Sequence, residues 1–503
     1  MPSLERGRKR WWALAVLALP TLLISVDMTV LGFALPYLSE DLAPSGAEQL
    51  WIVDIYSFVL AGLLVFMGTL GDRVGRRKLL LTGAVAFGVA SVLAAFSTSP
   101  LMLILARALL GVGGATLMPS TLSLLRGIFT DDRERRIAIA VWSSAFSGGM
   151  ALGPVVGGWL LGHFWWGSVF LINVPVMVLL LIAGPFLLPE ARDPNPGRFD
   201  PLSAVLSLAT VLPVVYGIKV LATEGFSVVA VLGILVGAGF GVVFVRRQRA
   251  LESPMIDLAL FANPRFTGSV VTNLLAVFAL SGLLFLVPQY LQLVLGKSPL
   301  EAALWVLPSS AASVLGAMAA VWFAKRFRVP VLVSGGLVVA AIGCVVLAAA
   351  GVESGLAAVV IGFVVVGGGV ALADTLTNDM IISAAPAERA GAASAISEMG
   401  FELGGALGTA ILGSVATAVY RGGLPAGTPE AARETLGGAV ATAQQLPADQ
   451  AGALLGAAKE AFVNGLNITA LAATAVLVYT GVQALILLNR KSNSAVRTES
   501  GLR

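Results

Sequence analysis

A single carboxylate, Asp27, lies inside the first long apolar stretch of the chain, which runs from Trp11 to Leu38 and carries no other charge. If this stretch crosses a bilayer, a carboxylate near its middle costs about 2.5–3.5 kcal/mol on insertion scales. An acid kept at such a cost is typical of a proton or cation site. The alternative is a structural aspartate that is satisfied by a neighbouring helix.

Two further acids, Glu398 and Glu402, lie four residues apart in the apolar stretch 390–419. On a helix this spacing stacks them on one face, about 6 Å apart. Like charges that close disfavour double ionisation, so at least one carboxyl is expected to hold a proton when no cation is bound. An arriving cation would favour ionisation, and the two ligands would then compete for shared acids. A polar contact between helices is the alternative.

Other polar and aromatic residues in apolar stretches are candidates for binding a cation. Asp54 comes one turn into the stretch 50–70, where it could attract cations at the outer mouth or extend to the membrane interface. Three aromatic residues, Phe33, Tyr56 and Phe146, would suit planar cations because an aromatic face attracts positive charge. We therefore include these four residues in a predicted substrate site.

Several other kinds of chemistry are disfavoured by the residues that the chain lacks. It has one histidine, His163, and one cysteine, Cys344, which gives neither a metal cluster nor a nucleophile–base pair. The tripeptide at 296–298 reads Gly-Lys-Ser, but Leu291 stands where a phosphate-binding loop needs its first glycine. We expect no enzyme activity, no metal, no cofactor other than protons as coupling ion, and no nucleic-acid partner.

The composition indicates an all-α protein that crosses a membrane many times. The chain has 503 residues, 57% of them hydrophobic and only 12% charged, whereas globular domains carry about 25% charged residues. A membrane span needs about 20 apolar residues. Fourteen stretches of that kind are predicted as spans: 13–37, 50–70, 79–97, 101–125, 137–161, 167–188, 202–222, 226–245, 267–291, 300–323, 330–350, 355–381, 390–419 and 462–488.

The basic residues predict the orientation of these spans. Most of the 32 lysines and arginines fall on one side if the spans alternate, which is the positive-inside pattern with both termini in the cytoplasm. Similar basic segments at 68–83 and 322–335 suggest two six-helix halves. The predicted organisation is a cytoplasmic N-terminus (1–12), a first six-helix bundle (13–188), two inserted spans with a linker (189–266), a second bundle (267–488) with an outer loop (420–461), and a cytoplasmic tail (489–503).

The turn between the second and third spans, GDRVGRRK, contains Gly71, Asp72, Arg73, Gly75 and Arg76. The two glycines permit a sharp reversal, and Asp72 can pair with Arg76. This spacing resembles a signature of the major facilitator superfamily. Two more stretches resemble motifs of the same superfamily: LILARALLGVGGA, which contains Arg107, and GMALGPVVGG, which contains Gly149, Gly153, Pro154, Gly157 and Gly158.

With fourteen spans, the chain resembles the drug:proton antiporter family of that superfamily, and within it the exporters of quaternary ammonium compounds and dyes. The resemblance implies that Arg107 sets the proton affinity of Asp27; bonding to backbone carbonyls alone is the alternative. It also implies a monomer in a bacterial inner membrane that exports cationic or zwitterionic drugs, including ethidium-like dyes and fluoroquinolones. An exporter of an endogenous lipid, siderophore or antibiotic would have the same fold.

Overall fold

The structure is a computed structural model that describes residues 2–192, 200–251, 254–385 and 389–489. The predicted tail therefore lies, from residue 490 on, outside the described residues. All regular elements in the described ranges are helical, and fourteen helices are long and apolar enough to cross a membrane, which confirms the predicted all-α class and number of spans.

Most helices begin and end within a few residues of the predicted spans, but α1 begins at Pro2 rather than near residue 13, and α17 begins at Ala448 rather than near residue 462. The first half contains α1 (Pro2–Leu42), α2 (Gly46–Val74), α3 (Arg76–Ala95), α4 (Pro100–Ile128), α5 (Asp132–His163), the single turn α6 (Ser168–Leu171) and α7 (Asn173–Leu187). The rest contains α8 (Pro201–Glu224), α9 (Val228–Ala250), α10 (Pro264–Gln289), α11 (Pro299–Phe323), α12 (Val329–Leu347), α13 (Leu356–Ser383), α14 (Ala390–Gly423), α15 (Glu430–Glu434), α16 (Leu436–Ala443) and α17 (Ala448–Leu488).

The chain divides into two compact units. The first unit consists of residues 1–212, 288–307 and 420–459, and the second consists of residues 213–287, 308–419 and 460–503. The boundary between the units therefore falls within α8, α10, α11, α14 and α17. The domain boundaries predicted from the sequence stay a prediction.

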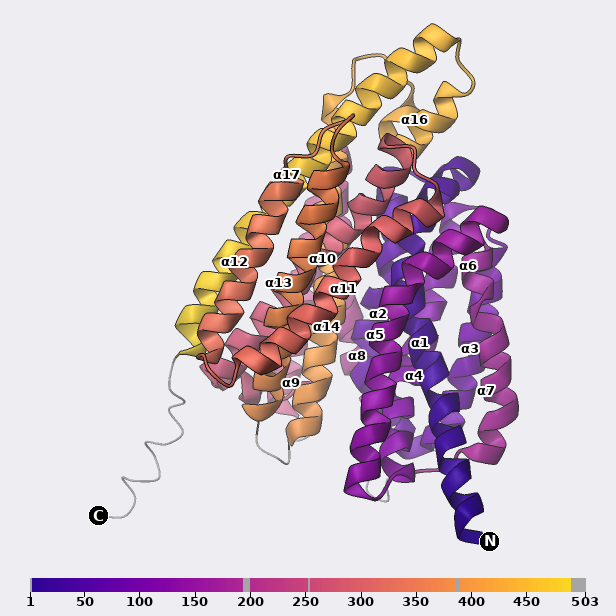
Figure 1. The fold of residues 1–503 in the computed structure, drawn as a ribbon, viewed down its shortest axis with the longest axis vertical. Helices are drawn as coiled ribbons and strands as arrows, with labels where there is room; N and C mark the ends of the chain where they lie inside the picture. Colours follow the sequence, from indigo (N-terminus) through magenta and orange to yellow (C-terminus); the bar gives the residue numbers. More distant parts are fainter. Residues whose placement is uncertain (1, 193–199, 252–253, 386–388, 490–503) are drawn as a thin grey trace. The chain divides into compact units, whose positions relative to one another are not determined.

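In the first unit, α1 lies beside α5, and α4 packs against α2 and α3 (Figure 1). The contact between α1 and α5 depends on glycines of α5, because a Cβ atom added at Gly149 would overlap the backbone carbonyl of Leu22, and one added at Gly153 would overlap the side chain of Thr29. Small residues at this four-residue spacing let two helices approach closely. This close packing fixes the part of α1 that carries Asp27.

In the second unit, α14 packs on α10 in the same way. Cβ atoms added at Gly404 and Gly408 would overlap the backbone carbonyls of Leu274 and Phe278 on α10. The fifth span of each half thus packs closely on the first span of that half. This common packing is consistent with the internal repeat that the basic loops suggest.

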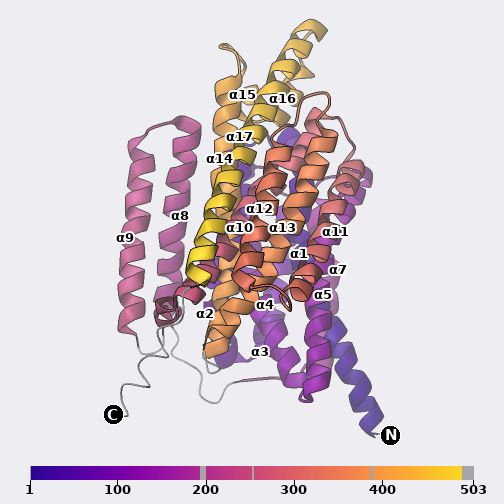
Figure 2. The same cartoon turned by 60° about the vertical axis from the view of Figure 1, so that its left-hand side comes forward.

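The inserted helices α8 and α9 form an antiparallel pair (Figure 2). Within the second unit, Gly217 of α8 lies against the backbone of Ala230 and the side chain of Ile234 on α9. Within the first unit, the hydroxyl group of Ser207 on α8 donates to the carbonyl of Gly62 on α2 at 3.1 Å. The first part of α8 therefore packs on α2 within the first unit, and the rest of α8 packs on α9 within the second.

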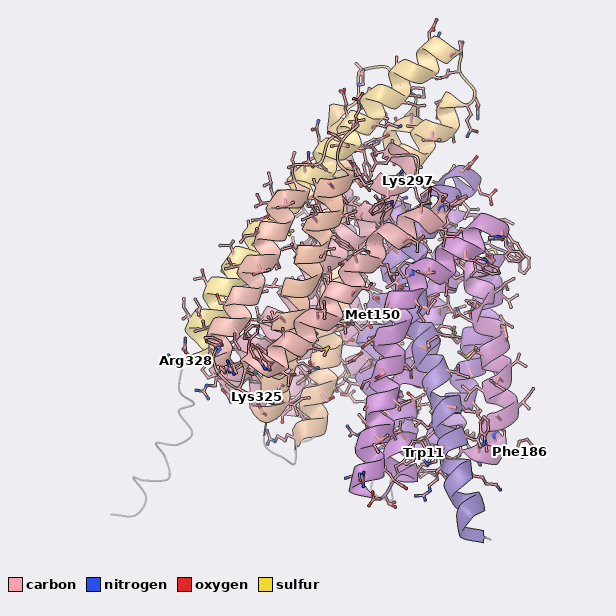
Figure 3. The ribbon with its side chains drawn as sticks, viewed as in Figure 1. Trp11, Met150, Phe186, Lys297, Lys325 and Arg328 are labelled. Carbon is pink, nitrogen blue, oxygen red and sulfur yellow. The ribbon has the colours of Figure 1, made fainter. Side chains whose placement is uncertain are left out.

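Much of the segment 420–459, which is part of the predicted outer loop, is helical, because it contains α15, α16 and the beginning of α17. The carboxylate of Glu434 accepts hydrogen bonds from the backbone of Gly46 at 2.8 Å and from Arg421 at 2.7 Å. Residues of α16 line a pocket together with Glu40 and Lys297. Lys297 is labelled in Figure 3.

Candidate functional site

The predicted acid Asp27 forms a buried ion pair in the first unit. Its Oδ2 accepts a hydrogen bond from Nη1 of Arg107 on α4 at 2.5 Å, and each residue is only 1% exposed. The other carboxylate oxygen, Oδ1, is buried and accepts no hydrogen bond from any residue in the described ranges. Asp27 is therefore held on one side by a cation while its second oxygen still has acceptor capacity.

Arg107 is also held by contacts that do not involve Asp27. Its Nε donates to the carbonyl of Ile52 at 3.1 Å and its Nη2 donates to the carbonyl of Val53 at 3.3 Å, both on α2. Its guanidinium lies over the ring of Tyr56, 4.8 Å from the ring centroid, where the negative face of the ring attracts it. Arg107 therefore pairs with Asp27 in addition to bonding backbone carbonyls, and its role in setting the proton affinity of Asp27 stays a prediction.

These contacts give a specific prediction for Arg107→Lys. A lysine keeps the positive charge beside Asp27 but lacks the planar set of donors that reaches Ile52 and Val53. Hydrogen bonds from charged donors contribute about 1.5–3 kcal/mol each, so we expect a clear loss of thermal stability in detergent and a several-fold slower transport. Arg126→Lys, at an exposed position near the end of the same helix, is the control and should behave like the wild type. Equal melting temperatures for the two variants would contradict this account.

Asp54 does not extend to the membrane interface. Its side chain is 1% exposed and belongs to the helix turn of α2 that holds Arg107. This corrects the alternative in which Asp54 reaches the interface, because protein atoms enclose the carboxylate. Its predicted part in attracting cations stays a prediction.

The three aromatic residues of the predicted substrate site differ in burial. Phe33 and Tyr56 are buried in the first unit, and Tyr56 already presents one face to Arg107. The carbonyl of Phe33 accepts a hydrogen bond from Gln292 at 3.2 Å. Phe146 on α5 is half-buried, so part of its ring is accessible. A drug could contact Phe33 only after local repacking of the first unit.

The turn between α2 and α3 is a compact charged junction. Gly75 has φ +113°, a value that side chains other than glycine rarely adopt. Arg76 donates to Asp72 at 2.5 Å, as the sequence predicted, and the backbone of Arg76 donates to the carbonyl of Ala191 at 2.8 Å. A Cβ added at Gly71 would lie 3.0 Å from Arg76. Arg73 of the same motif has an exposed side chain.

The remaining motif residues belong to α5. Pro154 lies inside this helix and supplies no backbone N–H. A Cβ added at Gly157 would overlap the side chain of Val30, and one added at Gly158 would lie 2.8 Å from the backbone of Leu300 at the start of α11. The motif therefore lets α5 contact two helices closely within the first unit.

In the second unit, α14 carries both predicted glutamates, Glu402 fully buried and Glu398 half-buried. Sequence reasoning missed that Asp374 on α13 lies close enough to Glu398 for the two negative charges to repel each other. Asp374 also accepts a hydrogen bond from the amide of Asn273 on α10. No local pattern marks this cluster, because its members are far apart in the sequence.

Arg389 forms an ion pair with Asp257 at 2.7 Å, although Asp379 is the acid closer to it in the sequence. Asp379 is exposed near the end of α13, where water can solvate its charge.

Comparisons with known proteins agree with the all-helical, membrane-spanning fold. Residues 17–409 match the model of a family described as the Major Facilitator Superfamily. The chain is 52% identical to the multidrug efflux pump LfrA of Mycolicibacterium smegmatis, over 94% of this chain and 95% of that protein. It is 38% identical to the methyl viologen resistance protein SmvA of Salmonella typhimurium, over 90% of this chain and 93% of that protein.

A third relative is the tetracenomycin C resistance and export protein of Streptomyces glaucescens, 33% identical over 95% of this chain and 92% of that protein. Among solved structures, a bacterial homolog of the human lysosomal transporter Spinster, in an inward-facing and unoccupied conformation, aligns with a TM-score of 0.68. The alignment covers 97% of this chain and 99% of that chain at 19% identity, so it supports the fold alone.

Proposed function

Because the chain belongs to the major facilitator superfamily, and is thus a multi-pass membrane transporter rather than an enzyme, we propose that it is a proton-coupled antiporter that exports drugs. The proposed substrates are cationic or zwitterionic amphipathic drugs: quaternary ammonium compounds, ethidium-like dyes and fluoroquinolones. The observation that carries the proposal is the buried pair of Asp27 and Arg107. The names of the relatives, a multidrug efflux pump and a methyl viologen resistance protein, support the drug class.

The pair suits a site where a proton and a cation compete. A proton or a cationic drug can neutralise Asp27, whereas Arg107 keeps its carbonyl and ring contacts on α2 in either state. The charge of Asp27 can therefore change while the guanidinium of Arg107 keeps its hydrogen bonds and its ring contact. One charge moved through 100 mV supplies about 2.3 kcal/mol, so exchange of protons for drug can sustain a useful gradient.

We place the protein in a bacterial inner membrane, with both termini in the cytoplasm, on the basis of its basic segments. A monomer contains both units, so a single chain is proposed to be sufficient for transport. Alternating access would expose Asp27, and with it Glu398 and Glu402, to each side of the membrane in turn. In this scheme proton entry from outside accompanies drug exit.

Dye flux in inside-out membrane vesicles tests this function. When respiration acidifies the lumen, we expect ethidium to accumulate in vesicles that contain the protein, and a protonophore to release it. Vesicles without the protein are the control. Ethidium movement that ignores the proton gradient, or that runs in the direction of import, would contradict the proposal.

Export of an endogenous antibiotic is a second candidate function. It is favoured by the similarity to the tetracenomycin C resistance and export protein, which this chain covers almost completely. A lipid or siderophore exporter would belong to the same class. This candidate predicts no transport of singly charged dyes, so the vesicle experiment separates it from multidrug export.

A further inference from the structure

A polar cluster in the second unit joins three membrane-spanning helices. Asn273 on α10 donates from Nδ2 to Oδ1 of Asp374 on α13, and Asp374 interacts electrostatically with Glu398 on α14. Asn273 is 3% exposed, and both carboxylates are only partly accessible. A hydrogen bond between Ser397 and Asn378, at 3.0 Å, joins α14 to α13 beside the cluster. One amide and two acids thus lie near one another, and of these three residues the predicted site includes only Glu398.

The amide of Asn273 has an unused acceptor. Its Oδ1 is buried and receives no hydrogen bond from the described residues. It faces α14, because a Cβ added at Gly400 would lie 4.0 Å from it. Leaving a buried acceptor without a donor is costly. The cluster therefore has a place for a group that brings an O–H donor, such as a protonated carboxyl.

Within the second unit, α12 and α13, and the parts of α11, α14 and α17 that belong to this unit, contain no lysine or arginine. The nearest further ionisable groups on the same helices are also acids, Glu402 on α14 and Asp379 on α13. The packed helices α12 and α11, the latter from residue 308 on, contain no charged residue, and α17 contains no lysine or arginine from residue 460 on. The basic residues Arg265 and Arg421 lie at helix ends, and Arg389 is paired with Asp257. Two carboxylates without a counter-charge favour uptake of a cation.

We propose that Asp374 and Glu398 form a second proton-binding site, in which repulsion between the two negative charges keeps a proton on one of the two carboxyl groups until a cationic drug arrives. Asn273 is a positioning residue, because its N–H group donates to Asp374 and keeps that carboxylate as the ionised partner of the pair. When a singly charged drug binds, one proton leaves to water and the total charge is conserved. This inference rests on the proposed proton-coupled export and adds Asp374 to it.

The pH dependence of ethidium affinity tests the site in the full-length protein in lipid nanodiscs. Drug affinity should rise with pH as the pair loses its proton. Asp374→Asn removes the neighbouring charge and should move the midpoint of this rise about one unit toward lower pH. Asn273→Leu, similar in size but without a donor, should move the midpoint toward higher pH. Every variant retains Asp27, so the contribution of Asp27 to the pH dependence of ethidium affinity is the same in all of them.

Asp379→Asn is the matched control, since it removes an exposed acid from the same helix, and should leave the midpoint unchanged. If Asp374→Asn moves the midpoint to lower pH and Asn273→Leu moves it to higher pH, the site is supported. Residues with a merely structural role would not shift the midpoint in opposite directions. If both keep the wild-type midpoint while wild-type affinity still depends on pH, the site is wrong and the proposed function stands. A wild type whose affinity ignores pH would overturn both. A midpoint that depends on the sodium concentration at constant ionic strength, with potassium as replacement, would also overturn the proton assignment.

Discussion

Asp27→Asn is expected to reduce protonophore-sensitive ethidium efflux from cells at least about tenfold. The amide keeps the shape of the side chain but can neither ionise nor exchange a proton for a cation. It also leaves Arg107 buried without its carboxylate, and breaking a buried ion pair from one side costs about 3–5 kcal/mol. Because Arg107 keeps its bonds to Ile52 and Val53, we expect the lower end of that range.

A double variant separates loss of coupling from loss of folding. Asp27→Asn combined with Arg107→Gln removes both buried charges, so the thermal stability should recover much of what the single variant loses. Efflux should stay absent, because the acid is still missing. An Asp27→Asn protein that pumps ethidium with the protonophore sensitivity of the wild type would contradict the role of Asp27.

Gly149→Val is expected to abolish transport and to lower the yield of folded protein. A Cβ at Gly149 would overlap the backbone carbonyl of Leu22 and the side chain of Ser25. Backbone atoms cannot yield as a flexible side chain can, and overpacking typically costs about 1–3 kcal/mol. The shift of α1 away from α5 would also displace Asp27, which lies two residues after Ser25. Expression, thermal stability and dye efflux measure the effect.

Gly148→Val is the matched control for that substitution. A Cβ added at Gly148 has nothing within 4 Å, although the residue is the immediate neighbour of Gly149. The control should fold and pump like the wild type, since the added methyl groups meet open space. If Gly148→Val and Gly149→Val have the same effect, the glycine motif of α5 does not act by permitting close contact between α1 and α5.

The sequence was sufficient for the spans because apolar stretches of about 20 residues have few alternatives to crossing a membrane. It was also sufficient to single out Asp27, the only charge in its stretch. The beginning of α17 was not predictable in the same way. The segment 448–461 is polar enough to look like a loop, yet it contains no proline, and the helix continues through it.

Contacts that depend on how the helices pack could not be predicted from the sequence. Asn273 and Asp374 lie 101 residues apart, so only the arrangement of α10 and α13 brings them together. The ring of Tyr56 could equally have faced a ligand, and its position beside Arg107 follows from how α2 meets α4. Arg389 pairs with a residue distant in the sequence rather than with Asp379 for the same reason.

The central claim is that Asp27 exchanges a proton for a cationic drug. Proton release on addition of ethidium to the purified protein, in a weakly buffered solution with a pH indicator, tests it most directly. The wild type should release protons, and Asp27→Asn should release measurably fewer at equal drug occupancy. Equal proton release from the two proteins at equal occupancy would contradict the claim.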